Sequence, residues 1–263
     1  TPQRPAPDPD LVDQLAKLIA ESKHPIILAG RGVLRSGAAP ALEALAERCG
    51  ALLATSLFAK GLFDHNRFGI GVAGAYASGR AREEFAACDL LIGVGAGLGH
   101  YTTEAGYLYP NAQTVQIDLN PRGLYQGLRI ADLHIKADAK AAAEAVLAQL
   151  AERNHSSAGA RSPMLANQIA ATAARPDSKE FLVAPGTVDP RPAMLELDTA
   201  IPKDWTVIMG GAHFAGIAVT HMYGRRAEHV HVINDFGAIG SAFPAAIGMA
   251  AARNDGKVLL IEG

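Results

Sequence analysis

The sequence has few cysteines and no excess of charge of one sign. Only Cys49 and Cys88 occur among 263 residues, and the formal net charge at pH 7 is −2. Two thiols are too few for the disulfide framework of a small secreted domain, so we expect buried, unpaired cysteines and a cytoplasmic protein. Basic and acidic residues are mixed along the chain, which gives no footprint for nucleic acid or for an anionic membrane surface.

Long apolar runs and several catalytic motifs are also missing. No apolar stretch approaches the roughly 20 residues that cross a bilayer, so no membrane partner is expected. The opening TPQRPAPDPD lacks the basic and apolar regions of a signal peptide, and residues 1–7 are predicted to be a linker. No GxSxG elbow, Walker loop, HExxH or CxxC pair occurs, which argues against hydrolase and P-loop chemistry.

What the sequence does contain is an alternation of apolar strands and helices over residues 8–153. Asp8 is predicted to cap a first helix that has Pro9 at its first position, and Ser36 is predicted to cap the helix at 37–50. Near-continuous apolar strands separated by helices are typical of a parallel sheet covered on both faces, so we predict a doubly wound α/β domain. The predicted strands are 25–30, 51–55, 89–95, 112–120 and 131–137, and the last helix is 138–153.

The alternation of predicted strands and helices stops after this domain. Residues 154–189 collect Ser, Pro, Ala and charged residues and are predicted to form a linker with one short helix at 164–173. Alternation resumes over residues 190–263, with strands at 204–211, 229–235 and 257–263 and helices at 192–201, 212–222 and 239–253. Three strands make only part of an α/β domain, so we expect the remainder of this second unit to follow Gly263.

Three strand ends in the first domain carry residues that suit nucleotide binding. AGRGV (29–33) and GVGAGLG (93–99) each follow a predicted strand, and Asp118 ends a third. Ligands of open α/β sheets bind at the carboxyl ends of strands, where glycine admits a phosphate and a carboxylate can hold a ribose hydroxyl. The alternative is that these glycines serve only tight turns, and the sequence leaves both readings open.

Histidine and lysine residues at other junctions are equally ambiguous. His229 and His231 alternate along a predicted strand, but the sequence places no third ligand beside them, which argues against a metal site. His213 follows the strand TVIMGG and either helps to receive a diphosphate or packs locally. Lys60 is either a loop residue or a phosphate contact.

Taken together, these segments resemble the superfamily of thiamine-diphosphate-dependent decarboxylases and carboligases, most closely its acetolactate (acetohydroxyacid) synthase-like branch. AGRGV, ATSLFAKGLF, GVAGAY, DLLIGVGAGL and TVQIDLNP occur in the order of that family's central domain. DWTVIMGGAHF, DFGAIGSAFPAAIGMAAA and KVLLIEG resemble the first half of its diphosphate-binding domain. The resemblance covers nearly the whole chain.

The resemblance implies roles for residues of the second unit. Ile239 matches the bulky residue that wedges between the two rings of thiamine diphosphate, and Gly237 matches the position whose carbonyl accepts from the 4′-amino group. Ala238 lies between them in the same cofactor-binding block. Gly211 and His213 match the segment that contacts the diphosphate.

The resemblance also bears on the first domain and on what lies outside the chain. Gly30, Arg31, Gly32, Gly97 and Asp118 match positions at which flavin-binding members touch the dinucleotide. Relatives variously bind FAD, ADP or neither. The aspartate and asparagine that hold Mg²⁺ in the family would follow Gly263, and the glutamate that activates the cofactor would precede Thr1. No catalytic residue and no metal ligand is therefore expected in this chain, which we expect to be inactive alone.

The parent protein is accordingly expected to decarboxylate a 2-keto acid, to join it to a second carbonyl compound, or to do both. It would use thiamine diphosphate and Mg²⁺ as a homodimer or homotetramer. The alternative is a non-catalytic module that binds FAD or an adenine nucleotide.

Overall fold

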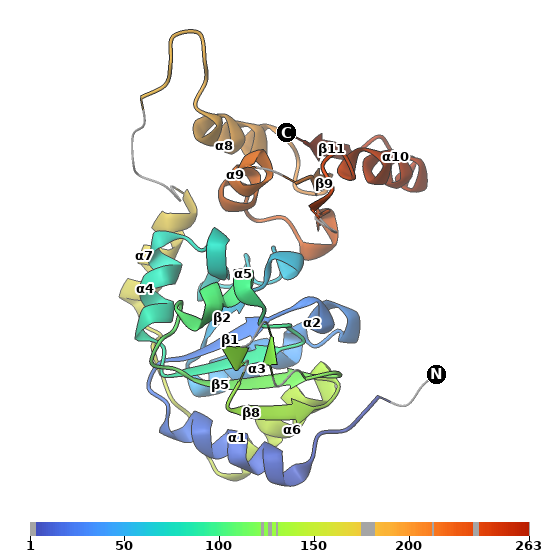
Figure 1. The fold of residues 1–263 in the computed structure, drawn as a ribbon. Coiled ribbons are helices and arrows are strands. Elements are labelled where there is room, and N and C mark those ends of the chain that lie inside the picture. The colour runs from blue at the N-terminus through green and yellow to red at the C-terminus, as the bar shows by residue number, and fades with distance from the viewer. Residues whose placement is uncertain are drawn as a thin grey trace.

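The computed structural model describes residues 4–121, 124–125, 128–129, 131–174, 182–211, 213–233 and 237–262. Within them lies a six-stranded parallel sheet with the order β3-β2-β1-β4-β5-β8 (Figure 1). Its strands are β1 (Pro25–Ala29), β2 (Leu52–Thr55), β3 (Gly69–Val72), β4 (Leu90–Val94), β5 (Gln113–Asp118) and β8 (Leu133–Lys136). The predicted α/β class with a parallel sheet is confirmed.

Helices cover both faces of this sheet. Successive side chains along a strand point to opposite faces, so the apolar strands present an apolar surface on each face for helices to cover. Ile27, on β1, belongs to the apolar cluster beneath one set of helices, and its neighbour Ile26 belongs to the cluster on the other face. The first set is α1 (Pro9–Glu21), α2 (Arg31–Ser36), α3 (Ala39–Cys49) and α6 (Ala139–Glu152). The second set is α4 (Gly79–Ala87) and α7 (Pro163–Ala174).

A smaller parallel sheet of three strands has the order β10-β9-β11. The strands are β9 (Thr206–Met209), β10 (Val230–Val232) and β11 (Val258–Ile261). Helices α8 (Pro190–Ala200) and α9 (His213–His221) pack on one face, and α10 (Ala242–Arg253) packs on the other. Only β9 is buried along its whole length.

Short elements connect these layers. They are α5 (His100–Thr103), the two-stranded ribbon β6 (Leu124–Tyr125) and β7 (Leu128–Arg129), and the 3₁₀ helices η1 (Leu57–Ala59), η2 (Gly74–Tyr76), η3 (Glu104–Gly106) and η4 (Ala227–His229). No helix among the described residues is both long and apolar enough to cross a membrane.

Several local predictions hold and others are wrong. Asp8 caps α1, and Pro9 is its first residue. Ser36 does not cap α3: it is the last residue of α2, and its hydroxyl donates to the carbonyl of Val33, while Ala38 stands at the start of α3. The helix predicted from residue 239 begins at Ala242, because Gly240 adopts a left-handed φ of 86° that a helix cannot contain.

Some predicted segments lie partly outside the described residues. These are the linkers at 1–7 and 154–189, the helix at 212–222 and the strands at 229–235 and 257–263, which include the undescribed residues 1–3, 175–181, 212, 234–235 and 263.

Candidate functional site

The carboxyl ends of β1 and β4 meet where the strand order of the large sheet reverses. From β1 the chain runs outward to β2 and β3, then returns to β4 on the other side of β1. Such a switch point leaves a crevice outside the sheet, because the loops from the two neighbouring strands turn in opposite directions. The predicted nucleotide residues of the first domain belong to these loops and to the end of β5, the next strand.

The glycines here bring the two loops into backbone contact. The N–H of Gly30 donates to the carbonyl of Val94 at 2.9 Å, and that of Gly32 donates to the carbonyl of Gly95 at 3.0 Å. A Cβ atom on Gly30 would lie 2.2 Å from the Gly95 oxygen, and one on Gly32 would lie 2.6 Å from the Gly95 Cα. Close loop packing is therefore sufficient to require glycine at both positions.

A cavity of about 740 Å³ opens beside this contact. Of the five predicted nucleotide residues, Arg31, Gly32 and Asp118 line the cavity, whereas Gly30 and Gly97 are not among its lining residues. The remaining lining residues are Arg4, Pro5, Arg35, Ser36, Gly95, Leu119, Asn120, Ala137, Asp138 and Ala139.

Charges of both signs surround the cavity. Three arginines line it, and the guanidinium of Arg31 lies over the ring of Phe58 at 4.3 Å from the ring centroid. Asp118 accepts a hydrogen bond from the N–H of Asn120 at 2.9 Å, which orients its carboxylate at the end of β5. Cations beside an oriented carboxylate can bind a small molecule that carries both phosphates and hydroxyl groups.

The predicted diphosphate residues of the second unit lie after β9. Gly211 follows the strand end, and His213 is the exposed first residue of α9. Gly210 is the last residue held by the sheet, since its N–H donates to the carbonyl of Ile261 at 2.9 Å. The intervening Ala212 lies outside the described residues.

The predicted wedge residue stands on an exposed turn before α10. Gly237 and Gly240 adopt φ values of 65° and 86°, which favour glycine, and an added Cβ at either position would meet no atom within 4 Å. Ile239 is 76% exposed, which is unusual for a large apolar side chain with a β-branch. Ala238 is exposed beside it and accepts a hydrogen bond from the Ser241 hydroxyl at 2.7 Å.

Sequence reasoning missed Glu262, which connects these two segments. One carboxylate oxygen, Oε1, accepts from the N–H of Gly240 at 3.1 Å. The other, Oε2, is shielded from solvent and has no hydrogen-bond partner among the residues that the structure describes. A Cβ on Gly210 would lie 2.1 Å from Oε2, so the carboxylate occupies the space that a side chain at position 210 would fill. The available signal was a single carboxylate at the end of the apolar run VLLI.

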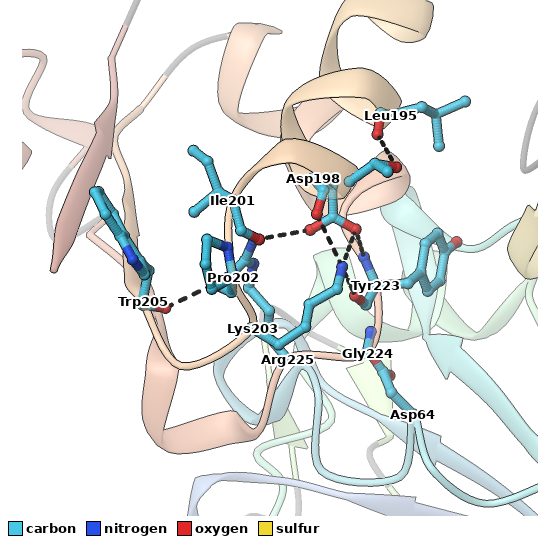
Figure 2. A network of polar contacts seen from close by, with 11 residues as sticks. Asp64, Leu195, Asp198, Ile201, Pro202, Lys203, Trp205, Tyr223, Gly224 and Arg225 are labelled. Carbon is cyan, nitrogen blue, oxygen red and sulfur yellow. Dashed lines mark hydrogen bonds and ion pairs between the residues drawn. The ribbon is translucent and has the colours of Figure 1, made fainter.

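A buried polar network holds the segment that follows α9 (Figure 2). Arg225 is 2% exposed, and its guanidinium donates to the carbonyls of Pro202 at 2.7 Å and Ile201 at 3.0 Å. It also lies 3.2 Å from the carboxylate of Asp198 on α8. Lys203 donates to the second oxygen of Asp198 at 2.6 Å, so this carboxylate meets two cations.

The same segment contacts the first domain. The N–H of Gly224 donates to Asp64 at 3.0 Å, and the ammonium of Lys60 lies 4.8 Å from the ring centroid of Tyr223. Lys60 is only 4% exposed, and burial lowers its pKa below the ordinary value. The structure therefore places Lys60 at the junction between the two sheets, and Lys60 is not among the residues that line the 740 Å³ cavity.

The remaining histidines do not gather around a common point. His229 ends η4 instead of lying on β10, and its Nδ1 lies 3.5 Å from the Arg253 guanidinium. His231 donates through Nε2 to the carbonyl of Glu228 at 3.1 Å. No group of three or more His, Cys, Asp or Glu residues that could hold a metal ion occurs in the part of the chain that the structure describes.

Comparison with known proteins bears on both units. The sequence profile described as "Thiamine pyrophosphate enzyme, central domain" matches residues 12–150. A "Probable acetolactate synthase large subunit" of Methanocaldococcus jannaschii is 36% identical over 141 residues, which are 53% of this chain and 24% of that protein. An "Acetolactate synthase" of Mycobacterium bovis is 33% identical over 146 residues, 55% of this chain and 23% of the relative.

A further relative extends the similarity into the second unit. "Sulfoacetaldehyde acetyltransferase" of Rhodobacter capsulatus is 31% identical in an alignment of 223 residues that covers 76% of this chain and 37% of that protein. This chain therefore spans between 23% and 37% of the length of the three curated relatives.

Proposed function

This chain belongs to the thiamine pyrophosphate enzyme family, and we propose that it is part of an enzyme that uses thiamine diphosphate and Mg²⁺ to decarboxylate a 2-keto acid, to join it to a second carbonyl compound, or both. The family match over residues 12–150 carries this proposal. Two names among the relatives, acetolactate synthase and sulfoacetaldehyde acetyltransferase, differ in the reaction they describe. The proposal therefore leaves the keto acid and the acceptor open.

The residues at the carboxyl end of the small sheet fit the cofactor. Gly211 and His213 follow β9. Ile239 is exposed on the glycine turn before α10, and Glu262 holds this turn near the end of β11 by accepting a hydrogen bond from Gly240. The buried, unpartnered oxygen of Glu262 is an acceptor available to a donor that arrives with the cofactor. When bound, thiamine diphosphate would supply the electron sink for loss of carbon dioxide.

This chain's own contribution would be binding and orientation. We propose that Gly211 and His213 contact the diphosphate, and that Gly237, Ala238 and Ile239 contact the two rings. A β-branched side chain such as Ile239 is stiff, which suits a wedge. Mg²⁺ prefers carboxylate and phosphate oxygens, and we propose no ligand for it among the described residues.

The test uses the full-length parent protein after removal of metal and cofactor with a chelator. Carbon dioxide release from a panel of 2-keto acids should appear only when thiamine diphosphate and Mg²⁺ are both restored. Ile239→Ala should reduce turnover in the restored enzyme. Release of carbon dioxide without added thiamine diphosphate, or none with it, would contradict the proposal.

A second candidate function is supported by the 740 Å³ cavity of the large sheet. We propose that it binds FAD or an adenine nucleotide, with Arg31 near the phosphates and Asp118 near a ribose. Calorimetric titration with FAD and ADP should give saturable binding that Arg31→Ala and Asp118→Ala weaken. Flat titrations with both nucleotides would reject this function without affecting the first.

The assembly and compartment are also proposals. The apolar side chains of Phe243 and Ile247 lie four residues apart on α10 and are 60% and 58% exposed, which favours a homodimer or homotetramer that covers them. Sedimentation of the full-length protein tests this. Both cysteines are buried and unpaired, which agrees with the reducing cytoplasm.

A further inference from the structure

The turn that carries Ile239 has few contacts of its own to hold it. Gly237, Ala238, Ile239 and Gly240 are all exposed, and both glycines have open space around them. A turn of this kind samples many conformations unless a side chain fixes it, because glycine loses more backbone freedom on ordering than any other residue. Its side-chain hydrogen bonds are that from Gly240 to Glu262 and that from Ser241 to Ala238. Of these two bonds, both within the described part of the chain, the first connects the turn to a different element and the second lies within the turn region.

Glu262 is well placed to hold this turn. It follows β11, whose residues pair in register with β9 up to Ile261 and Met209. Its backbone position is thus set by the sheet, while its carboxylate reaches across to the N–H of Gly240. A carboxylate that accepts from a backbone N–H forms a stronger bond than a neutral acceptor does. Glu262 is therefore held by the sheet, and its carboxylate in turn holds the exposed turn.

Gly210 makes room for this arrangement. Because a Cβ at position 210 would come within 2.1 Å of Oε2, only glycine lets the carboxylate lie over the end of β9. The side chain of Glu262 thus touches the ends of two strands and the turn before α10. Gly211 and His213 follow one of these strands, β9, and Ile239 lies in the turn.

We propose that Glu262 is a positioning residue for the cofactor. It holds the Gly237–Gly240 turn against the end of β9, so that Ile239 stands ready for thiamine diphosphate before the cofactor binds. The inference rests on the proposed function for the identity of the ligand. Preorganisation of this kind strengthens binding because the ordering of the turn is completed in advance.

The unpartnered oxygen sharpens the proposal. A buried acceptor without a donor raises the free energy of the cofactor-free protein, and a donor that arrives with the cofactor removes that cost. Glu262→Gln keeps the size of the side chain and one acceptor oxygen for Gly240, but it replaces the other oxygen with an amide group that donates. The two roles of the carboxylate can therefore be separated by mutation.

The experiment compares Glu262→Ala, Glu262→Gln and the control Glu228→Ala in the full-length protein. Glu228 lies in the same unit and forms an exposed ion pair with Arg226. Hydrogen exchange of peptides that cover residues 237–241 is measured without cofactor, and affinity for thiamine diphosphate with Mg²⁺ is measured by calorimetry. Neither measurement depends on turnover.

We expect Glu262→Ala to exchange at least about tenfold faster in these peptides and to bind thiamine diphosphate about tenfold more weakly. Glu262→Gln should keep slow exchange and yet bind more weakly than wild type, and Glu228→Ala should match wild type in both. The Gln variant also provides the binding result if Glu262→Ala does not fold.

Two outcomes separate this inference from the proposed function. A wild-type protein that binds no thiamine diphosphate overturns the proposed function, and the role toward the cofactor falls with it. A wild-type protein that binds while both Glu262 variants bind equally tightly overturns only the role of Glu262. Unchanged exchange in a folded Glu262→Ala protein likewise shows that another contact holds the turn.

Discussion

The two parallel sheets differ in how completely the described helices cover them. Strands β1 and β4 of the large sheet are buried at every position, with apolar clusters on both faces. In the small sheet β10 is only half-buried, and α10 exposes Phe243 and Ile247 by 60% and 58%. A parallel sheet is stable when both its faces are covered. The large sheet meets this condition within the described chain, and the small one does so only in part.

Because its sheet is less completely covered, the second unit depends more on polar contacts for its stability than the first domain does. The second unit contacts the first domain through the segment Tyr223–Arg225, which Asp198 holds from one side and Asp64 from the other. It also contacts that domain through an apolar cluster in which Val72 packs with residues of β9 and α9. The two candidate sites differ in the same way as the two sheets on which they lie. The nucleotide cavity rests on a closed core, whereas the turn with Ile239 stands on elements that are half-exposed.

The largest effect is expected from Asp198→Ala. It leaves Arg225 buried without its carboxylate, and removal of one partner of a buried ion pair costs about 3–5 kcal/mol of unfolding free energy. Fluorescence of Trp205, the single tryptophan, reports on the second unit. Its transition should move to lower denaturant ahead of the far-ultraviolet circular dichroism transition.

The control for this variant is Asp204→Ala. Asp204 pairs with Lys257 at 2.7 Å on the surface of the same unit, and exposed pairs contribute little. Coincident transitions in Asp198→Ala, shifted no further than in the control, would show that the second unit does not depend on the network.

The next effect is expected in the large sheet. Gly30→Ala forces a Cβ against the Gly95 carbonyl, and such overpacking typically costs about 1–3 kcal/mol. Circular dichroism during thermal unfolding measures the loss. Gly97→Ala is the matched control, because its added Cβ would meet nothing within 4 Å. Equal stability of the two variants would mean that the loop contact is dispensable.

The rate at which thiols react with iodoacetamide measures how well each of the two regions is shielded from solvent. Burial raises the pKa of Cys49 to about 11 and that of Cys88 to about 12, so at pH 8 both should resist iodoacetamide in the folded protein. A cysteine introduced as Ile239→Cys should react at once. Rapid labelling of the native thiols would contradict the closed core of the large sheet.

The same pKa values set the alkaline limit of stability. Above the ordinary pKa of 9.0, the unfolded chain loses its thiol protons while the folded chain keeps them. The free energy of unfolding should therefore fall as the pH rises through 9 and level off near the folded values. Denaturant titrations at pH 8 and pH 10 measure the change, and Cys49→Ala should reduce it.

The smallest effect on stability is expected from Ile239→Ser. The side chain is 76% exposed, and surface substitutions usually change stability by less than about 0.5 kcal/mol. In the full-length protein the same variant should nevertheless weaken thiamine diphosphate binding. A large loss of stability would show that Ile239 packs against something beyond the described residues.

Local signals in the sequence predicted much of the large sheet. Apolar runs such as PIILAG and DLLIGVG became β1 and β4, because apolar runs this short, with glycine at their ends, are typical of strands buried on both faces. Helix α2 and strand β3 were not predicted. Strand β3 reads GIGV, in which two glycines dilute the apolar pattern, and α2 is too short to show helical periodicity.

The candidate sites were less predictable. Arg31, Gly32 and Asp118 line one cavity although Arg31 and Asp118 are 87 residues apart in the sequence, and their strand-end positions were a sufficient signal. Asp198 gave no signal, and Glu262 gave only a carboxylate after the run VLLI, because their importance comes from partners distant in sequence: Arg225 for Asp198 and Gly240 for Glu262.

The sequence by itself determined the class of the fold, the family and the strand ends at which ligands are expected, because period, glycine position and motif order are local properties. Tertiary structure alone decided that Gly30 and Gly32 face another loop, that Lys60 is buried at the junction, and that Glu262 reaches the turn of Ile239. These facts depend on which segments meet in space, and residue spacing along the chain does not specify that.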